Sequence, residues 1–112
     1  MKLLVAYIRP ESLNDVKKAL YEKEIYMFSV TNALGCGQQK GYSENYRGVQ
    51  TEVNLLKKVR LEIALNDGFV EPATQAIVKG AKTGQIGDGK IFVTSLERVV
   101  RIRTGEADSD AL

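Results

Sequence analysis

Runs of apolar residues, some continuous and some alternating with polar ones, predict four strands. The run at 2–8 stops before Pro10, which disfavours a helical conformation at the residue preceding it, so we expect a strand there. Between 58 and 66 an apolar side chain recurs at every second position, which is typical of a strand with one buried face. Apolar positions at 28–37 and 90–96 predict the remaining two strands.

Helical spacing of other apolar residues predicts two helices. The first begins at Ser12, because Ser12 and Asp15 three residues later match a capping box. Its apolar face comprises Leu13, Val16, Ala19 and Leu20. The equivalent stripe of the second helix comprises Val70, Ala73, Ile77 and Ala81. This helix tolerates Pro72, because proline is accepted in a first turn, and it ends near 80–84.

The order strand, helix, strand occurs twice and predicts an α+β fold: a ferredoxin-like βαββαβ sandwich, one domain over 1–112. Right-handed crossovers place both helices on the same face of the sheet. The strand at 2–8 is nevertheless apolar on both sides, since Leu3, Val5 and Tyr7 alternate with equally apolar residues. We therefore expect other copies of the chain to cover the second face, in an obligate homo-oligomer.

Composition narrows the possible chemistry. The chain has no histidine, which excludes most zinc sites and Ser-His or Cys-His catalysis. Its one cysteine, Cys36, cannot form an intrachain disulfide, and we expect it to be a packed side chain. The net charge of +2 is too small to indicate binding to nucleic acid or membranes. No apolar run resembles a signal peptide or a membrane span, so we expect a cytoplasmic protein.

A glycine-rich loop at 83–90 carries the clearest sign of ligand binding. It contains the spacing GxxxxGK of a Walker A loop, but Ile91 stands where that motif needs Ser or Thr. It also leaves a helix and enters a strand, the reverse of a Walker A loop. Its glycines would let backbone amides approach a phosphate, and Lys90 adds a cation. An ordinary glycine-rich turn is the alternative.

Two arginines near the end of the chain predict a second contact to phosphate. We expect 99–103 to be extended, so that Arg101 and Arg103 point to one side, with Arg98 and Lys90 nearby. A solvated basic edge strand would show the same pattern. No candidate general base accompanies these groups, which favours binding over hydrolysis and therefore a protein that is not an enzyme.

Three stretches resemble the PII nitrogen-regulatory signal-transduction family: GQQKGYSENYRG at 37–48, TGQIGDGKIFV at 83–93 and RVVRIRTGEADSDAL at 98–112. The resemblance implies a homotrimer that binds ATP or ADP in clefts between subunits and senses 2-oxoglutarate. The polar, unpatterned segment 37–55 would be the T-loop of the family, 83–90 its phosphate-binding loop and 98–112 its C-terminal segment. Implied partners are an ammonium channel of the Amt type or an enzyme of nitrogen metabolism.

The resemblance also assigns roles to individual residues. Expected at the nucleotide are Tyr7, Ser29, Gly35, Gly37, Gln38, Gln39, Glu62, Ala64, Gly87, Asp88, Gly89, Lys90, Arg101 and Arg103, the last two from the neighbouring subunit. Expected at 2-oxoglutarate are Gln39, Lys40, Gly41, Lys58 and Ile86. Gln39 would also bind a magnesium ion shared by ATP and 2-oxoglutarate. Tyr46, Arg47 and Gly48, at the T-loop tip, would contact the partner.

Other positions differ from the family pattern. Thr51 stands where relatives carry a uridylylated tyrosine and Val49 where some carry a phosphorylated serine, so we expect a sensor that responds to ligands alone.

Two other classes of protein stay open as alternatives to a PII regulator. An RNA-binding ferredoxin-like module needs aromatics on its central strands, and VRLEIAL at 59–65 has none. A small hydrolase such as an acylphosphatase needs a glycine-rich loop after the first strand, where this chain has Arg9 and Pro10.

Overall fold

Four antiparallel strands and two helices form the part of the chain that the computed structural model describes, residues 1–36 and 55–112. The strands are β1 (Lys2–Ile8), β2 (Ser29–Cys36), β3 (Leu55–Leu65) and β4 (Lys90–Ser95), and the helices are α1 (Leu13–Glu22) and α2 (Val70–Ala81). The sheet order β2-β3-β1-β4 confirms the expected ferredoxin-like arrangement. Within these residues no helix is long and apolar enough to cross a membrane.

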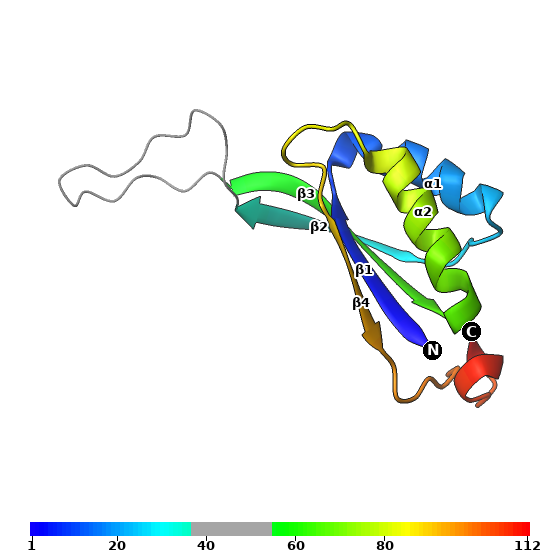
Figure 1. Cartoon of the computed structure of the whole chain (residues 1–112). Helices are drawn as coiled ribbons and strands as arrows, with labels where there is room; N and C mark the ends of the chain where they lie inside the picture. The colour runs from blue at the N-terminus through cyan, green and yellow to red at the C-terminus, as the bar shows by residue number, and fades with distance from the viewer. Residues whose placement is uncertain (37–54) are drawn as a thin grey trace.

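Both helices lie on one face of the sheet, as predicted (Figure 1). The core between the layers is formed by alternate strand residues and by one face of each helix. Its most fully buried large side chains are Leu4, Ile8, Val16, Leu20, Leu61, Ile63 and Ile77. Pro72 lies in the first turn of α2, where the sequence placed it. The spacing of apolar residues in the sequence therefore predicted correctly which side chains form the core between the sheet and the helices.

The opposite face of the sheet, here called the open face, has no cover within the described residues. Leu3, Val5 and Tyr7 of β1 are only half-buried there, whereas Leu4, Ala6 and Ile8 of the same strand are fully buried. Phe92, which pairs with Val5 across β1 and β4, is 54% exposed. An apolar face of this kind in water favours association with another surface. The expected homo-oligomer stays a prediction.

Three local expectations were wrong. Ser12 and Asp15 do not form a capping box, because a 3-10 turn at Pro10–Ser12 precedes α1 and already holds Ser12 in a helical conformation, without a capping hydrogen bond from its side chain. Strand β3 begins at Leu55, not near 58, because its first residues continue the ladder with β2 as far as Cys36. Cys36 is exposed there and not packed.

The C-terminal segment also differs from its prediction. It is not extended over 99–103: residues 102–104 form a turn, and Val100 makes an isolated antiparallel bridge with Ala107. Gly105, with a φ of 75°, supplies the left-handed conformation that reverses the chain. The argument that alternation in a strand places Arg101 and Arg103 on one side therefore does not hold.

The close approach of α1 and α2 predicts a strong effect of Gly80→Ala. A Cβ at Gly80 would lie 2.7 Å from backbone atoms of Val16, so the two helices must separate. We expect a loss of about 1–3 kcal/mol in the free energy of unfolding, measured by denaturant titration. Gly68→Ala is the matched control, because a Cβ there meets no atom within 4 Å. Equal stability of the two variants would contradict the packing argument.

Candidate functional site

The glycine-rich loop at 83–89 is closed by the carboxylate of Asp88. This carboxylate accepts hydrogen bonds from the backbone N–H groups of Thr83 at 2.8 Å and Gly84 at 2.9 Å. The Thr83 hydroxyl and the guanidinium of Arg9 donate to its other oxygen. The hydroxyl and amide of Thr83, with the Arg9 guanidinium and Gly84 amide adding smaller effects, hold the pKa of Asp88 well below its usual range. The side chain expected to cradle phosphates is therefore directed into the loop itself.

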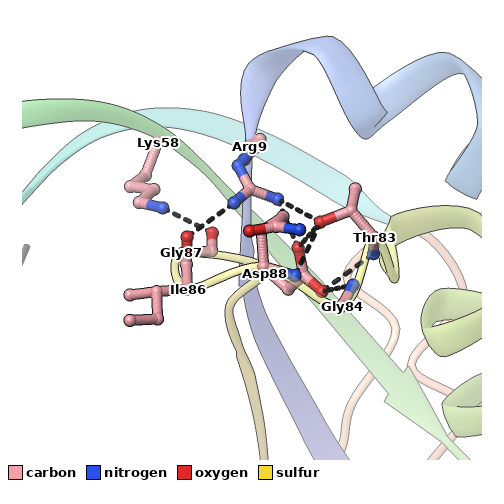
Figure 2. A network of polar contacts seen from close by, with 8 residues as sticks. Arg9, Lys58, Thr83, Gly84, Ile86, Gly87 and Asp88 are labelled. Atoms are coloured by element: carbon pink, nitrogen blue, oxygen red, sulfur yellow. Dashed lines mark hydrogen bonds and ion pairs between the residues drawn. The ribbon is translucent and has the colours of Figure 1, made fainter. Parts of the chain in front are cut away.

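Two cations from neighbouring strands point at the same loop (Figure 2). Arg9 follows β1 and donates from Nη2 to the carbonyl oxygen of Ile86 at 2.7 Å. Lys58 on β3 donates from Nζ to the carbonyl oxygen of Gly87 at 2.8 Å. Gly35 on β2 leaves room for this lysine, since a Cβ there would lie 3.0 Å from Lys58 Cγ. Lys58 and Ile86, both expected at 2-oxoglutarate, are thus brought together, whereas Arg9 was not assigned any role from sequence.

Three glycines in the loop are required by its backbone. Gly84, Gly87 and Gly89 have φ values of 87°, 104° and 111°, which L side chains rarely adopt. At Gly89 a Cβ would also lie 1.8 Å from the carbonyl oxygen of Tyr7, so no side chain fits without moving β1 or the loop. A loop held this close to the sheet by glycine exposes backbone amides, the groups that bind phosphate oxygens.

Several nucleotide residues expected from sequence share the open face. Tyr7 pairs with Lys90 across β1 and β4, and Ser29 pairs with Glu62 across β2 and β3. Residues opposite each other in a ladder have side chains on the same face. The Glu62 carboxylate forms an ion pair of 2.8 Å with Arg60, two residues away on β3. Sequence analysis did not assign Arg60 to the site.

The expected site is divided between the two ends of the sheet. Strand β4 runs from Lys90, opposite Tyr7, to Ser95, opposite Lys2, so its ends lie roughly 17 Å apart. The glycine-rich loop precedes the first end, and the C-terminal segment follows the second (Figure 1). Ala64, opposite Leu3, also lies toward the second end. Within one chain the structure therefore does not bring the loop and the C-terminal segment together.

The C-terminal arginines have different surroundings. Arg101 pairs through Nη1 with the Glu106 carboxylate at 2.9 Å and donates from Nη2 to the carbonyl oxygen of Ala111 at 3.3 Å. Arg103 is exposed in the turn. Asn66, after β3, donates to the carbonyl oxygen of Ser109 at 3.3 Å and holds this segment at its end of the sheet.

The remaining assignments fall on 37–54, outside the described residues. They are Gly37, Gln38, Gln39, Lys40, Gly41, Tyr46, Arg47 and Gly48, together with the departures at Val49 and Thr51. In the part of the chain that is described, no group of three or more Cys, Asp or Glu side chains is placed to hold a metal ion.

The role of Asp88 predicts a pH-dependent effect of Asp88→Asn. Because folding lowers the pKa of Asp88, its ionised form stabilises the fold above the ordinary aspartate pKa of about 3.9, and this contribution is lost as the pH falls below it. We expect thermal melting to show a lower Tm for the variant at pH 7, with the difference from wild type narrowing below about pH 4.

Glu97→Gln, at an exposed bend, is the control for loss of one surface carboxylate, and its Tm should follow that of wild type throughout. A Tm difference for Asp88→Asn that stays constant from pH 7 to pH 3 would contradict the stabilising role of the ionised carboxylate.

Comparisons with known proteins identify the family of the chain. The family model of nitrogen regulatory protein P-II matches residues 1–106. Nitrogen regulatory protein P-II of Azospirillum brasilense is 52% identical over the full length of both chains, and GlnK of Escherichia coli K12 is 48% identical over the full length of both. GlnK1 of Methanosarcina mazei is 48% identical over all of this chain and 97% of its own. The chain therefore belongs to the PII family and is a nitrogen-regulatory signal-transduction protein.

Proposed function

We propose that the protein is a homotrimer that binds ATP or ADP between adjacent subunits, binds 2-oxoglutarate beside ATP, and reports these ligands to a partner through 37–55. The proposed partner is an ammonium channel of the Amt type or an enzyme of nitrogen metabolism. The observation that carries the proposal is the division of the expected nucleotide site between opposite ends of a sheet whose open face lacks cover.

The first half of the proposed site is the glycine-rich loop. Its backbone comes within contact distance of β1 at Gly89, and Lys90 follows at the start of β4. Backbone amides in such a loop, together with one ammonium group, suit the oxygens of a polyphosphate. A bound adenine nucleotide would place its phosphates here and its base toward Tyr7 and Gly35.

The second half is the C-terminal segment of a neighbouring subunit. The C-terminal segment, which carries Arg101 and Arg103, follows the far end of β4 from the glycine-rich loop of its own chain (Figure 1). A single chain therefore cannot bring both the loop and these arginines to one nucleotide. A cyclic arrangement of identical subunits can bring the far end of one sheet to the near end of the next, and it repeats the same contact at every interface. Such an arrangement would also cover the open face.

The proposed 2-oxoglutarate site adjoins the loop at Lys58. A doubly charged acid beside a triphosphate needs a cation between the two anions and another at its far end. Lys58, already within 2.8 Å of the Gly87 carbonyl oxygen, would supply the second. Magnesium prefers oxygen ligands and retains substrate phosphates among them, so ATP, the oxo acid and the Gln39 amide oxygen form a suitable set. Magnesium would neutralise the charge between the two ligands.

Members of this family are regulators, and the loop chemistry favours binding over turnover. A general base works best when its pKa lies near the working pH. Asp88, the carboxylate within the loop, has a strongly lowered pKa. It already accepts hydrogen bonds from Thr83 at the start of the loop and from Arg9. We therefore propose that ATP acts as an effector and not as a substrate.

A site shared between subunits predicts complementation. Lys90→Ala and Arg103→Ala should each abolish ATP binding in calorimetry, because each removes a charge-assisted contact from every site. When the two variants are unfolded, mixed and refolded together, about a quarter of the sites should regain both residues and bind ATP. The recovery depends on one residue coming from each of two chains.

Sedimentation of the wild-type protein provides the control, since a composite site requires a trimer at micromolar concentration. Mixing the two variants without unfolding should restore nothing until subunits exchange. A folded monomer that binds ATP, or a refolded mixture that recovers no binding, would rule out the shared site.

The proposed arrangement of charges also predicts that 2-oxoglutarate binds only with ATP and magnesium. Calorimetry should show tight binding of 2-oxoglutarate in their presence, and little binding with ADP or with a chelator. Lys58→Ala should remove this binding while ATP still binds. Lys57→Ala is the matched control, because Lys57 is the preceding residue of the same strand and its side chain lies on the other face. Tight 2-oxoglutarate binding without magnesium would contradict the proposal.

A further inference from the structure

Arg9 makes more side-chain hydrogen bonds to the glycine-rich loop than any residue outside it in the described part of the chain. Its guanidinium donates to the Thr83 hydroxyl at 3.2 Å, to the carbonyl oxygen of Ile86 at 2.7 Å and to the Asp88 carboxylate. These three acceptors lie at the start, the middle and the end of the loop. The arginine side chain is 20% exposed and its partner Asp88 23% exposed, so the pair is shielded from most of the solvent. Figure 2 shows the guanidinium lying across the loop from the β1 side.

The guanidinium of Arg9 and the ammonium of Lys58 bind the carbonyl oxygens of two consecutive peptide groups. Arg9 holds the carbonyl oxygen of Ile86, and Lys58 holds that of Gly87. In a planar trans peptide the N–H points opposite to the C=O of the same unit. The N–H groups of Gly87 and Asp88 must therefore point away from the two cations. Within residues 1–36 and 55–112 neither amide has a hydrogen-bond acceptor.

We propose that Arg9 is a positioning residue for anion binding: it turns the Ile86–Gly87 peptide and fixes Asp88, so that consecutive backbone N–H groups face a phosphate. This rests on the proposed nucleotide function and adds a residue that touches the loop and not the ligand. Successive N–H groups pointing to one side form the kind of backbone concavity that binds phosphate oxygens. Gly87 permits this turn because its φ of 104° is open to glycine.

The planar shape of the guanidinium matters as much as its charge. One nitrogen reaches Asp88 and Thr83 while the other reaches the Ile86 carbonyl oxygen, so a single rigid group bridges both sides of the loop. A lysine carries the same charge on a single nitrogen and cannot reproduce this fork. Arg9→Lys therefore separates positioning from simple attraction of an anion.

The test compares full-length wild type with Arg9→Met, Arg9→Lys and Lys82→Met. Lys82 lies beside the loop, directly after α2, and its substitution removes one charge without removing a side-chain hydrogen bond or ion pair within the described residues. ATP affinity is measured by calorimetry and the fold by thermal melting. The backbone amide signals of Gly87 and Asp88 are followed by nitrogen-15 NMR before and after ATP is added.

We expect Arg9→Met and Arg9→Lys each to weaken ATP binding about tenfold or more, and Lys82→Met to change it less than about twofold. In the nucleotide-free protein the Gly87 and Asp88 signals should move in both Arg9 variants and stay in place in Lys82→Met. In wild type the same two amides should shift downfield when ATP binds. That last measurement needs no variant, so the inference can still be overturned if Arg9 substitutions prevent folding, because amides that do not meet the phosphate leave Arg9 nothing to position.

Full rescue by lysine would show that only the charge matters and would overturn the inference. So would unmoved Gly87 and Asp88 amides in wild type saturated with ATP. If wild type binds neither ATP nor ADP, the proposed function fails and this inference falls with it. That outcome is seen with wild type alone. It differs from the result that overturns only the inference, in which ATP binds equally well to wild type and to the Arg9 variants.

Discussion

The packing of both helices on one face of the sheet leaves the other face without cover from residues 1–36 and 55–112, and the expected ligand residues of the strands lie on that open face. Alternate residues of β1 and β3 bury the core on the helical side. The positions between them carry Tyr7, Lys58 and Glu62, which the family resemblance places at ligands. The two-residue period of a strand thus separates residues that maintain the fold from residues available for recognition.

Much of the fold could be predicted from sequence because its determinants are local or periodic. Apolar runs, the alternation at 59–65 and the helical stripes identified the four strands and both α-helices described, and right-handed crossovers then placed both helices on one face. The glycine-rich loop was found from the spacing of its glycines and Lys90, and the positive φ values at Gly87 and Gly89 explain why glycine is required there. Where a boundary was wrong, as at the start of β3, pairing with β2 had extended the strand beyond its hydrophobic pattern.

Other parts of the site depend on contacts that no local pattern contains. Arg9 and Asp88 are 79 residues apart in sequence, and an arginine before a proline carries no signal that it will reach a distant loop. The C-terminal segment was misjudged for a different reason. Gly105 offered a turn signal, but the alternation of Arg101 and Arg103 suggested a strand, and the bridge between Val100 and Ala107 shows that the turn prevailed.

The loop at 83–89 owes its shape to groups of its own chain: the Asp88 carboxylate, the Arg9 guanidinium and the glycines that let it pass close to β1. A loop that its own chain holds in this way before a ligand arrives would lose little conformational freedom on binding one. Under the proposed function, such a loop would receive every nucleotide in nearly the same conformation. The difference between one bound nucleotide and another would then have to be detected by parts of the protein other than 83–89.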